Sequence, residues 1–294
     1  MIITSASNEK LKNIKKLSKS SKERNEQSVF IVEGIRMFRE IPPEDIALVY
    51  VSETGAKKFA DELLDILGND YQDRDDYYVV SDKVFDSISD TGTPQGILAL
   101  VRQKENDLSN IINEKCDMIE RPDEDISLTD DGINVSDNAF ILDNAFILII
   151  EKLQDPGNLG TIIRTAEGAG VTGIIISGDS VDIYNPKVVR STMGSIFRVP
   201  VYISDDLIRD IELLKEKGIT VYGAHLKGEN IYNKDFSTSC AFLIGNEGNG
   251  LSEEVSKTAD ELIKIPMKGK VESLNAATST AVIAYEVLWQ RIYL

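Results

Sequence analysis

The sequence predicts an α/β protein, and two patterns support this. Short apolar runs that can form buried strands alternate with amphipathic stretches through most of the 294 residues. In the C-terminal half the predicted strands, such as Ile174 to Ser177 and Ala241 to Gly245, are apolar along their whole length. Continuous apolar strands separated by helices are typical of a mostly parallel sheet with helices on both faces.

The first hundred residues predict a small α/β domain of their own, spanning 1–102. Its expected helices are 8–18, a short segment through Met37 and Phe38, 56–67 and 82–88; its expected strands are 29–32, 47–51, 77–80 and 97–101. In helix 8–18, Leu11, Ile14 and Leu17 repeat every three residues, so one face is apolar and the lysines lie on the other.

The second predicted domain spans 144–294. Its expected strands are 144–151, 174–177, 199–203, 220–224, 241–245 and 262–265; its expected helices are 159–168, 186–190, 205–217, 252–258 and a last helix that ends near Arg291. In the last helix Ala277, Ala281, Ala284 and Leu288 share one face, which predicts close packing.

Residues 103–143 predict a linker or insertion between these domains. Periodicity fades here, acidic residues dominate, and loop formers appear. The sequence Asp-Asn-Ala-Phe-Ile-Leu occurs at 137–142 and again at 143–148, and only the second copy continues into an apolar strand.

Composition limits the class of protein. A formal net charge of −17 argues against a general nucleic-acid binder. However, the segment Lys10 to Arg24 has seven basic residues against Glu23 alone, so it is either solvated surface or a local RNA-binding face. Cys116 and Cys240 show no metal-ligand spacing, and neither a signal peptide nor a membrane span is evident, so we expect a cytoplasmic protein without a metal.

Two glycine-rich segments have different meanings. Residues 168–173 have the spacing of a dinucleotide-binding fingerprint, but they close a predicted helix instead of opening one, which favours helix termination. Residues 245–250, Gly-Asn-Glu-Gly-Asn-Gly, follow a strand and precede a helix. Their three glycines leave backbone groups open to a ligand, although a plain turn is the alternative.

Three segments occur in the order of the motifs of one enzyme family. They are 158–166 (Asn-Leu-Gly-Thr-Ile-Ile-Arg-Thr-Ala), 245–251 and 265–278 (Ile-Pro-Met-Lys-Gly-Lys-Val-Glu-Ser-Leu-Asn-Ala-Ala-Thr). Together they resemble the motifs of the SpoU (TrmH-like) RNA ribose methyltransferases, members of the SPOUT superfamily.

The resemblance implies a function and a topology. The function is transfer of a methyl group from S-adenosylmethionine to a ribose 2′-hydroxyl in RNA, by a homodimer whose methyltransferase domain has a trefoil knot. The N-terminal domain would select the RNA, and we expect ribosomal RNA. A transfer RNA substrate, or a catalytically silent RNA-binding or ribosome-assembly factor of the same fold, is the alternative. A generic nucleotide-binding enzyme is a third alternative, which only the α/β pattern and the glycines of 168–173 favour.

The resemblance also implies site residues. The expected catalytic residues are Asn158, Arg164, Glu247, Ser273 and Asn275. The expected contacts to S-adenosylmethionine are Gly245, Ile265 and Leu274.

Some of these residues have simpler explanations. Asn158 could cap the helix that follows it, Ser273 or Asn275 could cap the last helix, and Arg164 could be an ordinary exposed helical arginine. The one histidine, His225, lies outside every motif and is predicted to be structural. A guanidinium stays protonated, so Arg164 is expected to bind the target phosphate and stabilise negative charge on the 2′-oxygen.

Overall fold

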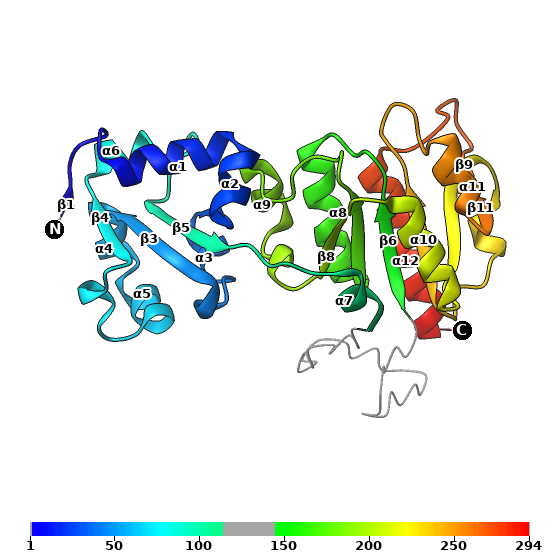
Figure 1. The fold of residues 1–294 in the computed structure, drawn as a ribbon, viewed down its shortest axis with the longest axis horizontal. Coiled ribbons are helices and arrows are strands. Elements are labelled where there is room, and N and C mark those ends of the chain that lie inside the picture. The colour runs from blue at the N-terminus through cyan, green and yellow to red at the C-terminus, as the bar shows by residue number, and fades with distance from the viewer. Residues whose placement is uncertain (1, 114–144, 294) are drawn as a thin grey trace, which may run out of the picture.

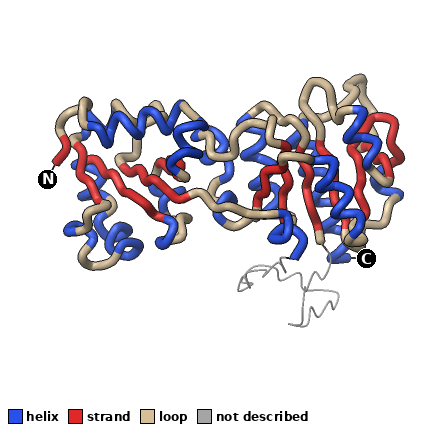
Figure 2. Tube along the Cα trace, in the orientation of Figure 1, coloured by secondary structure: helices blue, strands red, loops and turns tan. Residues whose placement is uncertain are grey.

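The structure is a computed structural model that describes residues 2–113 and 145–293. Two lobes lie side by side along the long axis of the molecule (Figure 1), the N-terminal lobe in blue and cyan and the C-terminal lobe in green to red. Each lobe has one sheet with helices on both faces. The segment after the last strand of the first sheet runs across to the second lobe (Figure 2).

The N-terminal lobe has a mixed five-stranded sheet of order β1-β4-β3-β5-β2. The strands are β1 (Ile2–Ile3), β2 (Val29–Glu33), β3 (Ile46–Ser52), β4 (Tyr77–Val80) and β5 (Ile97–Arg102). β1, β4 and β3 run parallel, whereas β5 is antiparallel to both β3 and β2. Alternate residues of β2 and β3 therefore enter two separate cores, one on each face of the sheet.

Helices cover both faces of this sheet. They are α1 (Glu9–Lys19), α2 (Ser21–Gln27), α3 (Ile35–Phe38), α4 (Glu53–Lys58), α5 (Ala60–Leu67) and α6 (Asp82–Asp86), with 3-10 turns η1 (Pro43–Asp45) and η2 (Tyr71–Asp73). The predicted apolar face of α1 is confirmed, because Leu11, Ile14 and Leu17 are all fully buried. Their burial fixes the lysines of α1 on the outer side of the lobe.

The C-terminal lobe is built on a fully parallel six-stranded sheet of order β11-β9-β10-β6-β7-β8. The strands are β6 (Phe146–Ile150), β7 (Gly173–Ser177), β8 (Val201–Ser204), β9 (Thr220–Asn230), β10 (Cys240–Ile244) and β11 (Glu261–Lys264). β7 and β8 extend on one side of β6, and the three later strands lie on the other side. The strand order therefore reverses between β6 and β10, where ligands of open α/β sheets commonly bind.

Helices cover both faces of this sheet too. They are α7 (Leu108–Asn113), α8 (Pro156–Gly168), α9 (Pro186–Thr192), α10 (Leu207–Glu216), α11 (Glu253–Thr258) and α12 (Ala276–Tyr293), with 3-10 turns η3 (Ser195–Phe197) and η4 (Ile231–Asn233). α8, α9 and α12 pack on one face, and α7, α10 and α11 pack on the other. The predicted parallel sheet between two helical layers is confirmed.

The structure corrects several details of the sequence prediction. The predicted helix 56–67 is two helices that meet at Phe59, whose ψ of 25° departs from helical geometry. The buried face of the last helix is turned from the predicted one: Ala277 and Ala284 are buried as predicted, but Ala281 and Leu288 are only half-buried, and Thr280, Ile283 and Val287 are buried as well. Part of the predicted linker, 108–113, is the helix α7. The rest of the linker, the first Asp-Asn-Ala-Phe-Ile-Leu copy and Cys116 lie outside the described residues.

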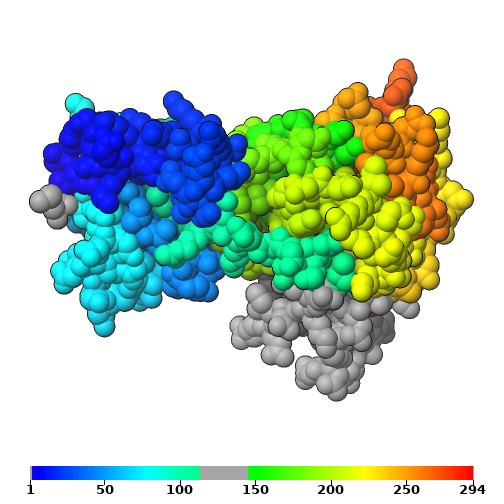
Figure 3. Space-filling view, viewed as in Figure 1, coloured from blue at the N-terminus to red at the C-terminus, as the bar shows by residue number. Residues whose placement is uncertain are grey.

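The two lobes share a continuous junction (Figure 3). Val189 of α9 and Ile196 of η3 belong to a core cluster of the N-terminal lobe, and the ring of Tyr184 lies 4.6 Å from that of Phe30. Arg24 is only 3% exposed and donates from Nε to Asp182 Oδ2 at 2.9 Å, and its guanidinium also donates to the Leu17 carbonyl. Arg24 is therefore part of the junction, and its predicted place on an outer basic face is wrong.

Replacing Arg24 is expected to destabilise the junction. Arg24→Ala leaves Asp182 and the Leu17 carbonyl without their partner, which should cost about 3 kcal/mol, the low end for a broken buried pair because Asp182 keeps some exposure. Arg39→Ala is the control: Arg39 forms an exposed pair with Glu62, which is worth at most about 1 kcal/mol. Urea denaturation followed by circular dichroism measures both, and equal midpoints for the two variants would contradict the expectation.

Candidate active site

A chain of hydrogen bonds joins one residue from each of the three motifs. The Asn275 side-chain amide donates to Asn158 Oδ1 at 3.0 Å, and the Asn158 amide donates to Glu247 Oε1 at 3.1 Å. The three residues are separated by 89 and 117 positions in sequence and belong to α8, the loop after β10 and the start of α12. The structure thus brings together three of the five predicted catalytic residues.

Asn158 is held in this chain by the first turn of α8. Asp155 caps the helix by accepting from the Asn158 backbone N–H at 2.7 Å, and Pro156 takes the first helical position. The helix begins three residues earlier than predicted, and a capping role for Asn158 is wrong. Its side chain is thereby free to bridge Glu247 and Asn275.

Glu247 is the most heavily hydrogen-bonded member of the chain. Besides the Asn158 amide, its carboxylate accepts from the backbone N–H groups of Asp155 at 3.1 Å and Gln154 at 3.3 Å. Partial burial raises the pKa of Glu247, but these hydrogen bonds lower it more, so its pKa lies below the ordinary value. Glu247 is therefore ionised at neutral pH and fixes the loop that follows β6.

The loop 245–251 is a tight turn that needs its glycines. Asn246 and Gly250 exchange two backbone hydrogen bonds of 3.0 and 2.9 Å, and Gly250 has a φ of +69°. A Cβ on Gly245 would lie 2.2 Å from the Gly250 carbonyl carbon, so only glycine fits at this approach. Gly245 thus has a structural role in closing the turn that presents Glu247.

The loop from Ile265 to Asn275 has backbone groups that are free to bind a ligand. Of the backbone–backbone hydrogen bonds in the described turns and loops, none comes from residues 266–274. Ile265 is half-buried and packs against the core, and Leu274 is half-buried. Asn275 caps α12, because its Oδ1 accepts from Ala277 N–H at 2.9 Å, whereas Ser273 is exposed and takes no part in the hydrogen-bonded chain.

Arg164 lies apart from this chain. It is six residues beyond Asn158 in α8, which turns its side chain about 240° around the helix and places it about 9 Å further along the axis. Arg164 is exposed, and within the described part of the chain no hydrogen bond or ion pair holds its guanidinium. In one protomer the predicted catalytic arginine is therefore not in contact with the rest of the predicted site.

An exposed apolar surface lies beside the helix face of Arg164. It consists of four α12 side chains that are 40–66% exposed, and we call it the α12 aromatic surface: Tyr285, Trp289, Ile292 and Tyr293. Gly168, one turn after Arg164 on the same side of α8, approaches α12 closely, since a Cβ there would lie 3.2 Å from the Tyr285 hydroxyl. Clustered exposed aromatic residues of this kind commonly mark a protein interface.

Histidine and metal chemistry receive no support from the described residues. His225 lies in β9, where its Nδ1 accepts from the Lys227 backbone N–H at 3.1 Å, a structural contact. Across 2–113 and 145–293, no cluster of three or more His, Cys, Asp or Glu side chains is arranged to hold a metal ion. Over the same ranges, no helix is both long and apolar enough to cross a membrane.

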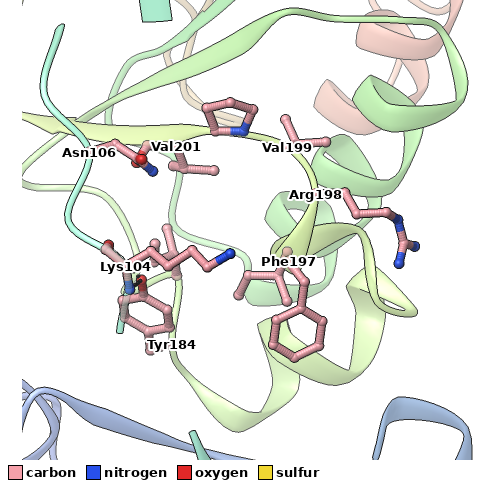
Figure 4. A pocket seen from close by; sticks show the side chains of 10 residues that line it. Lys104, Asn106, Tyr184, Phe197, Arg198, Val199 and Val201 are labelled. Atoms are coloured by element: carbon pink, nitrogen blue, oxygen red, sulfur yellow. Dashed lines mark hydrogen bonds between the residues drawn. The ribbon is translucent and has the colours of Figure 1, made fainter. Parts of the chain in front are cut away.

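The structure has a hollow at the junction of the lobes and another at the carboxyl ends of the strands. The first has a volume of about 120 Å³; Lys104 and Tyr184 lie on one side of it, and Arg198 points away from it (Figure 4). Lys104 forms an ion pair with Asp45 at 3.4 Å, so this hollow belongs to the junction. The second, of about 380 Å³, is lined by Gln154 and Asn246, which both contact the Glu247 carboxylate.

Sequence reasoning missed residues that support the site. Asp155 and Gln154 hold Glu247 through their backbone, and Glu151 lies buried at the end of β6. The Asp-Pro pair at 155–156 is an N-cap followed by proline, a recognised helix start. The role of Glu151 had no sequence signal, because it depends on a contact with Ser252, 101 residues away.

Comparison with known proteins adds two family matches. Residues 145–285 match the model of the SpoU rRNA Methylase family, and residues 8–99 match that of the MRM3-like substrate binding domain. The chain is 30% identical over 288 residues to the 23S rRNA (guanosine(2553)-2′-O)-methyltransferase RlmP of Bacillus subtilis, covering 97% of this chain and 98% of that protein. It is 36% identical over 149 residues to the 23S rRNA (guanosine-2′-O-)-methyltransferase RlmB of Xanthomonas campestris, covering 50% and 60%.

Solved structures share the whole fold. An AdoMet-bound rRNA methyltransferase from Sinorhizobium meliloti superimposes with a TM-score of 0.75 at 27% identity, covering 100% of this chain and 98% of that one. The SpoU methyltransferase AviRb from Streptomyces viridochromogenes, solved with AdoMet, gives a TM-score of 0.78 at 24% identity over 97% and 99%, a likeness of fold.

Proposed function

The chain belongs to the SpoU rRNA methylase family, and from this we propose how its residues carry out the reaction. The protein is an RNA (ribose-2′-O-)-methyltransferase that uses S-adenosylmethionine and acts on ribosomal RNA. The observation that carries the assignment of roles is the hydrogen-bonded chain Glu247–Asn158–Asn275, because it unites the three motifs at one place. It forms a rigid polar wall against which a ribose can be positioned.

The loops around this wall fit S-adenosylmethionine. The backbone groups of residues 266–274 are free of backbone partners, and Ile265 and Leu274 supply half-buried apolar side chains for an adenosine. We assign these two residues and Gly245 as its contacts, Gly245 by shaping the neighbouring turn. When bound, S-adenosylmethionine supplies an electrophilic methyl group.

The 2′-hydroxyl is a poor nucleophile, and Arg164 is the residue that we assign to it. A guanidinium can bind the adjacent phosphate through two N–H groups and can stabilise negative charge that develops on the 2′-oxygen. The proton then leaves through the phosphate or water. Arg164 cannot accept it, because a guanidinium stays protonated at neutral pH. Asn275 and Glu247 orient the ribose, and exposed Ser273 completes the loop that contacts it.

A homodimer would bring Arg164 to the site. In one protomer Arg164 lies away from the polar wall but beside the α12 aromatic surface, which is unpartnered within the described chain. Pairing two copies through this surface would bury the aromatic side chains and place each Arg164 next to the partner. The site is then shared between subunits.

The remaining expectations rest on the family. We assign residues 1–102 to an RNA-binding domain, 103–143 to an acidic connection and 144–294 to the methyltransferase domain. The matches to 8–99 and 145–285 support this division. The trefoil knot would lie in the methyltransferase domain, and a cytoplasmic location without a resident metal accords with ribosomal RNA as substrate.

The outer lysines of α1 are the proposed RNA contacts of the first lobe. Lys16 and Lys19 are exposed and have no ion-pair partner among the described residues. Reversing both to Glu should weaken RNA binding about tenfold or more at low salt and flatten the slope of log affinity against log salt by about two. Filter binding across a salt series measures this. The same reversal of Lys57 and Lys58 on α4 is the control. An equal loss of RNA affinity in both variants would mean that the RNA does not bind at α1.

The function is tested with ribosomal RNA and transfer RNA transcribed without modifications. Methyl transfer from labelled S-adenosylmethionine to ribosomal RNA, at a ribose mapped by its resistance to alkaline cleavage, is the expected result. Methylation of transfer RNA without methylation of ribosomal RNA would mean that the substrate is transfer RNA. Cofactor binding without transfer to either RNA would favour a silent ribosome-assembly factor.

A further inference from the structure

We propose that the hollow between the ends of β6 and β10 binds the base of the methylated nucleotide, that this base is guanine, and that Glu151 reads it. This inference rests on the proposed function and names the base at the same site. The hollow has a volume of about 380 Å³, enough for a purine, and it lies where the strand order of the sheet reverses. Lining residues come from the loops after β6, β7 and β10.

Glu151 carries the inference because one of its oxygens is unused. Its side chain is 4% exposed and lines the hollow, and its Oε2 accepts from the Ser252 backbone N–H at 2.8 Å. Within the described chain Oε1 accepts no hydrogen bond. The one side-chain nitrogen or oxygen atom there that is both fully buried and without a hydrogen bond is Asp45 Oδ2, so Glu151 Oε1 must still be reachable from solvent. A carboxylate oxygen that the protein leaves without a partner and that stays reachable from the hollow can accept a hydrogen bond from a ligand donor in place of water.

The hollow adjoins the wall that positions the ribose. Gln154 and Asn246 line it, and both are linked to Glu247: the Gln154 N–H donates to Glu247 Oε2, and the Asn246 amide lies 3.5 Å from the same oxygen. Asn246 also donates to the Lys152 carbonyl at 2.8 Å, which fixes the rim. A nucleotide whose 2′-hydroxyl faces Glu247 and Asn158 can therefore place its base in the hollow.

The chemistry of the lining selects a base with donors on its edge. A carboxylate oxygen only accepts, and guanine offers N1–H and the N2 amino group side by side on its Watson–Crick edge. Adenine presents the lone pair of N1 there, which repels a carboxylate. The side-chain amide of Asn249, which also lines the hollow, can donate to the acceptor O6 of guanine. Two relatives with matching sequences bear names that specify guanosine, which agrees with this selection.

The test is a change of base preference in Glu151→Gln. Glutamine keeps an oxygen for the Ser252 N–H and replaces Oε1 by an amino group, which donates to the N1 of adenine and opposes guanine. The methylated position is first mapped in unmodified ribosomal RNA. Fragments carrying guanosine, adenosine or uridine at that position are then compared by kcat/KM.

The expected result is at least ~100-fold preference of the unaltered enzyme for guanosine over adenosine, and at least a tenfold collapse of that ratio in Glu151→Gln. Glu151→Asp, which keeps a carboxylate, should be slower but still prefer guanosine. The control Glu253→Gln changes an exposed carboxylate at the start of α11 and should leave the ratio unchanged.

Other outcomes overturn the inference. A mapped adenosine or pyrimidine would overturn it, as would equal losses on all bases in Glu151→Gln, which would give Glu151 a structural role only. The proposed function would survive both results. Absence of transfer to any RNA by the unaltered enzyme would instead remove the proposed function, and this inference with it.

Discussion

Arg164→Ala is expected to lower methyl transfer by at least ~10²–10³-fold while leaving the affinity for S-adenosylmethionine unchanged. The guanidinium is the cationic group that we assign to the phosphate and the developing 2′-oxyanion, and Arg164 lies away from the loops assigned to the cofactor. Single-turnover transfer measures the first quantity and isothermal titration calorimetry the second. Arg209→Ala is the matched control, because Arg209 is an exposed helical arginine on α10 whose side chain has no ion pair in the described chain.

Mixing two inactive variants tests whether Arg164 acts from the partner. In a dimer of Arg164→Ala with Asn275→Ala, one site combines an intact Asn275 with the intact Arg164 of the other subunit. After exchange of subunits in equal amounts, about a quarter of the full activity should return. If activity stays at the level of the separate variants, Arg164 acts within its own protomer.

Loss of the α12 aromatic surface is expected to lower methyl transfer about as much as Arg164→Ala does. Tyr285→Glu with Trp289→Glu places two charges in the proposed dimer interface, so the protein should become a monomer of 32.6 kDa and lose methyl transfer by at least ~10²-fold, because each site loses the partner's Arg164. Light scattering after size exclusion and the transfer assay measure these two results.

The control for the dimer removes apolar groups elsewhere. Leu226 and Tyr232 are 59% and 52% exposed, and their change to Glu should leave the mass and the activity intact. A Tyr285/Trp289 variant that stays dimeric would place the interface on another surface. A fully active monomer would remove the shared site.

The fold could be predicted largely from sequence because its strands and helices are strongly patterned. Strands β6, β7 and β10 of the second lobe are buried at every position, and α1 buries its three apolar residues as its spacing predicts. The misplacements have local causes. Residues 56–67 have an uninterrupted helical pattern, and only the backbone at Phe59 reveals the break. The strand order depends on long-range pairing, which periodicity does not encode.

The candidate site was predictable only as a set of motifs. The residues Asn158, Glu247 and Asn275 could be named from resemblance, but their hydrogen-bonded chain depends on contacts across 89 and 117 residues. Arg24 shows the opposite failure: it belongs to a basic run in sequence, yet its partner Asp182 lies 158 residues away and draws it into the interior. Local charge patterns cannot reveal a distant partner of this kind.

The junction between the lobes sets a distance on the substrate. The first and second lobes are packed into one block by Arg24, by the shared core of Val189 and Ile196, and by the contact between the rings of Phe30 and Tyr184. The lysines of α1 and the hydrogen-bonded chain at the start of α8 are thereby kept at a fixed separation. For an enzyme of this family, the fixed separation means that the RNA feature bound by the first lobe selects the methylated ribose: only a ribose at the matching distance from that feature reaches the second lobe.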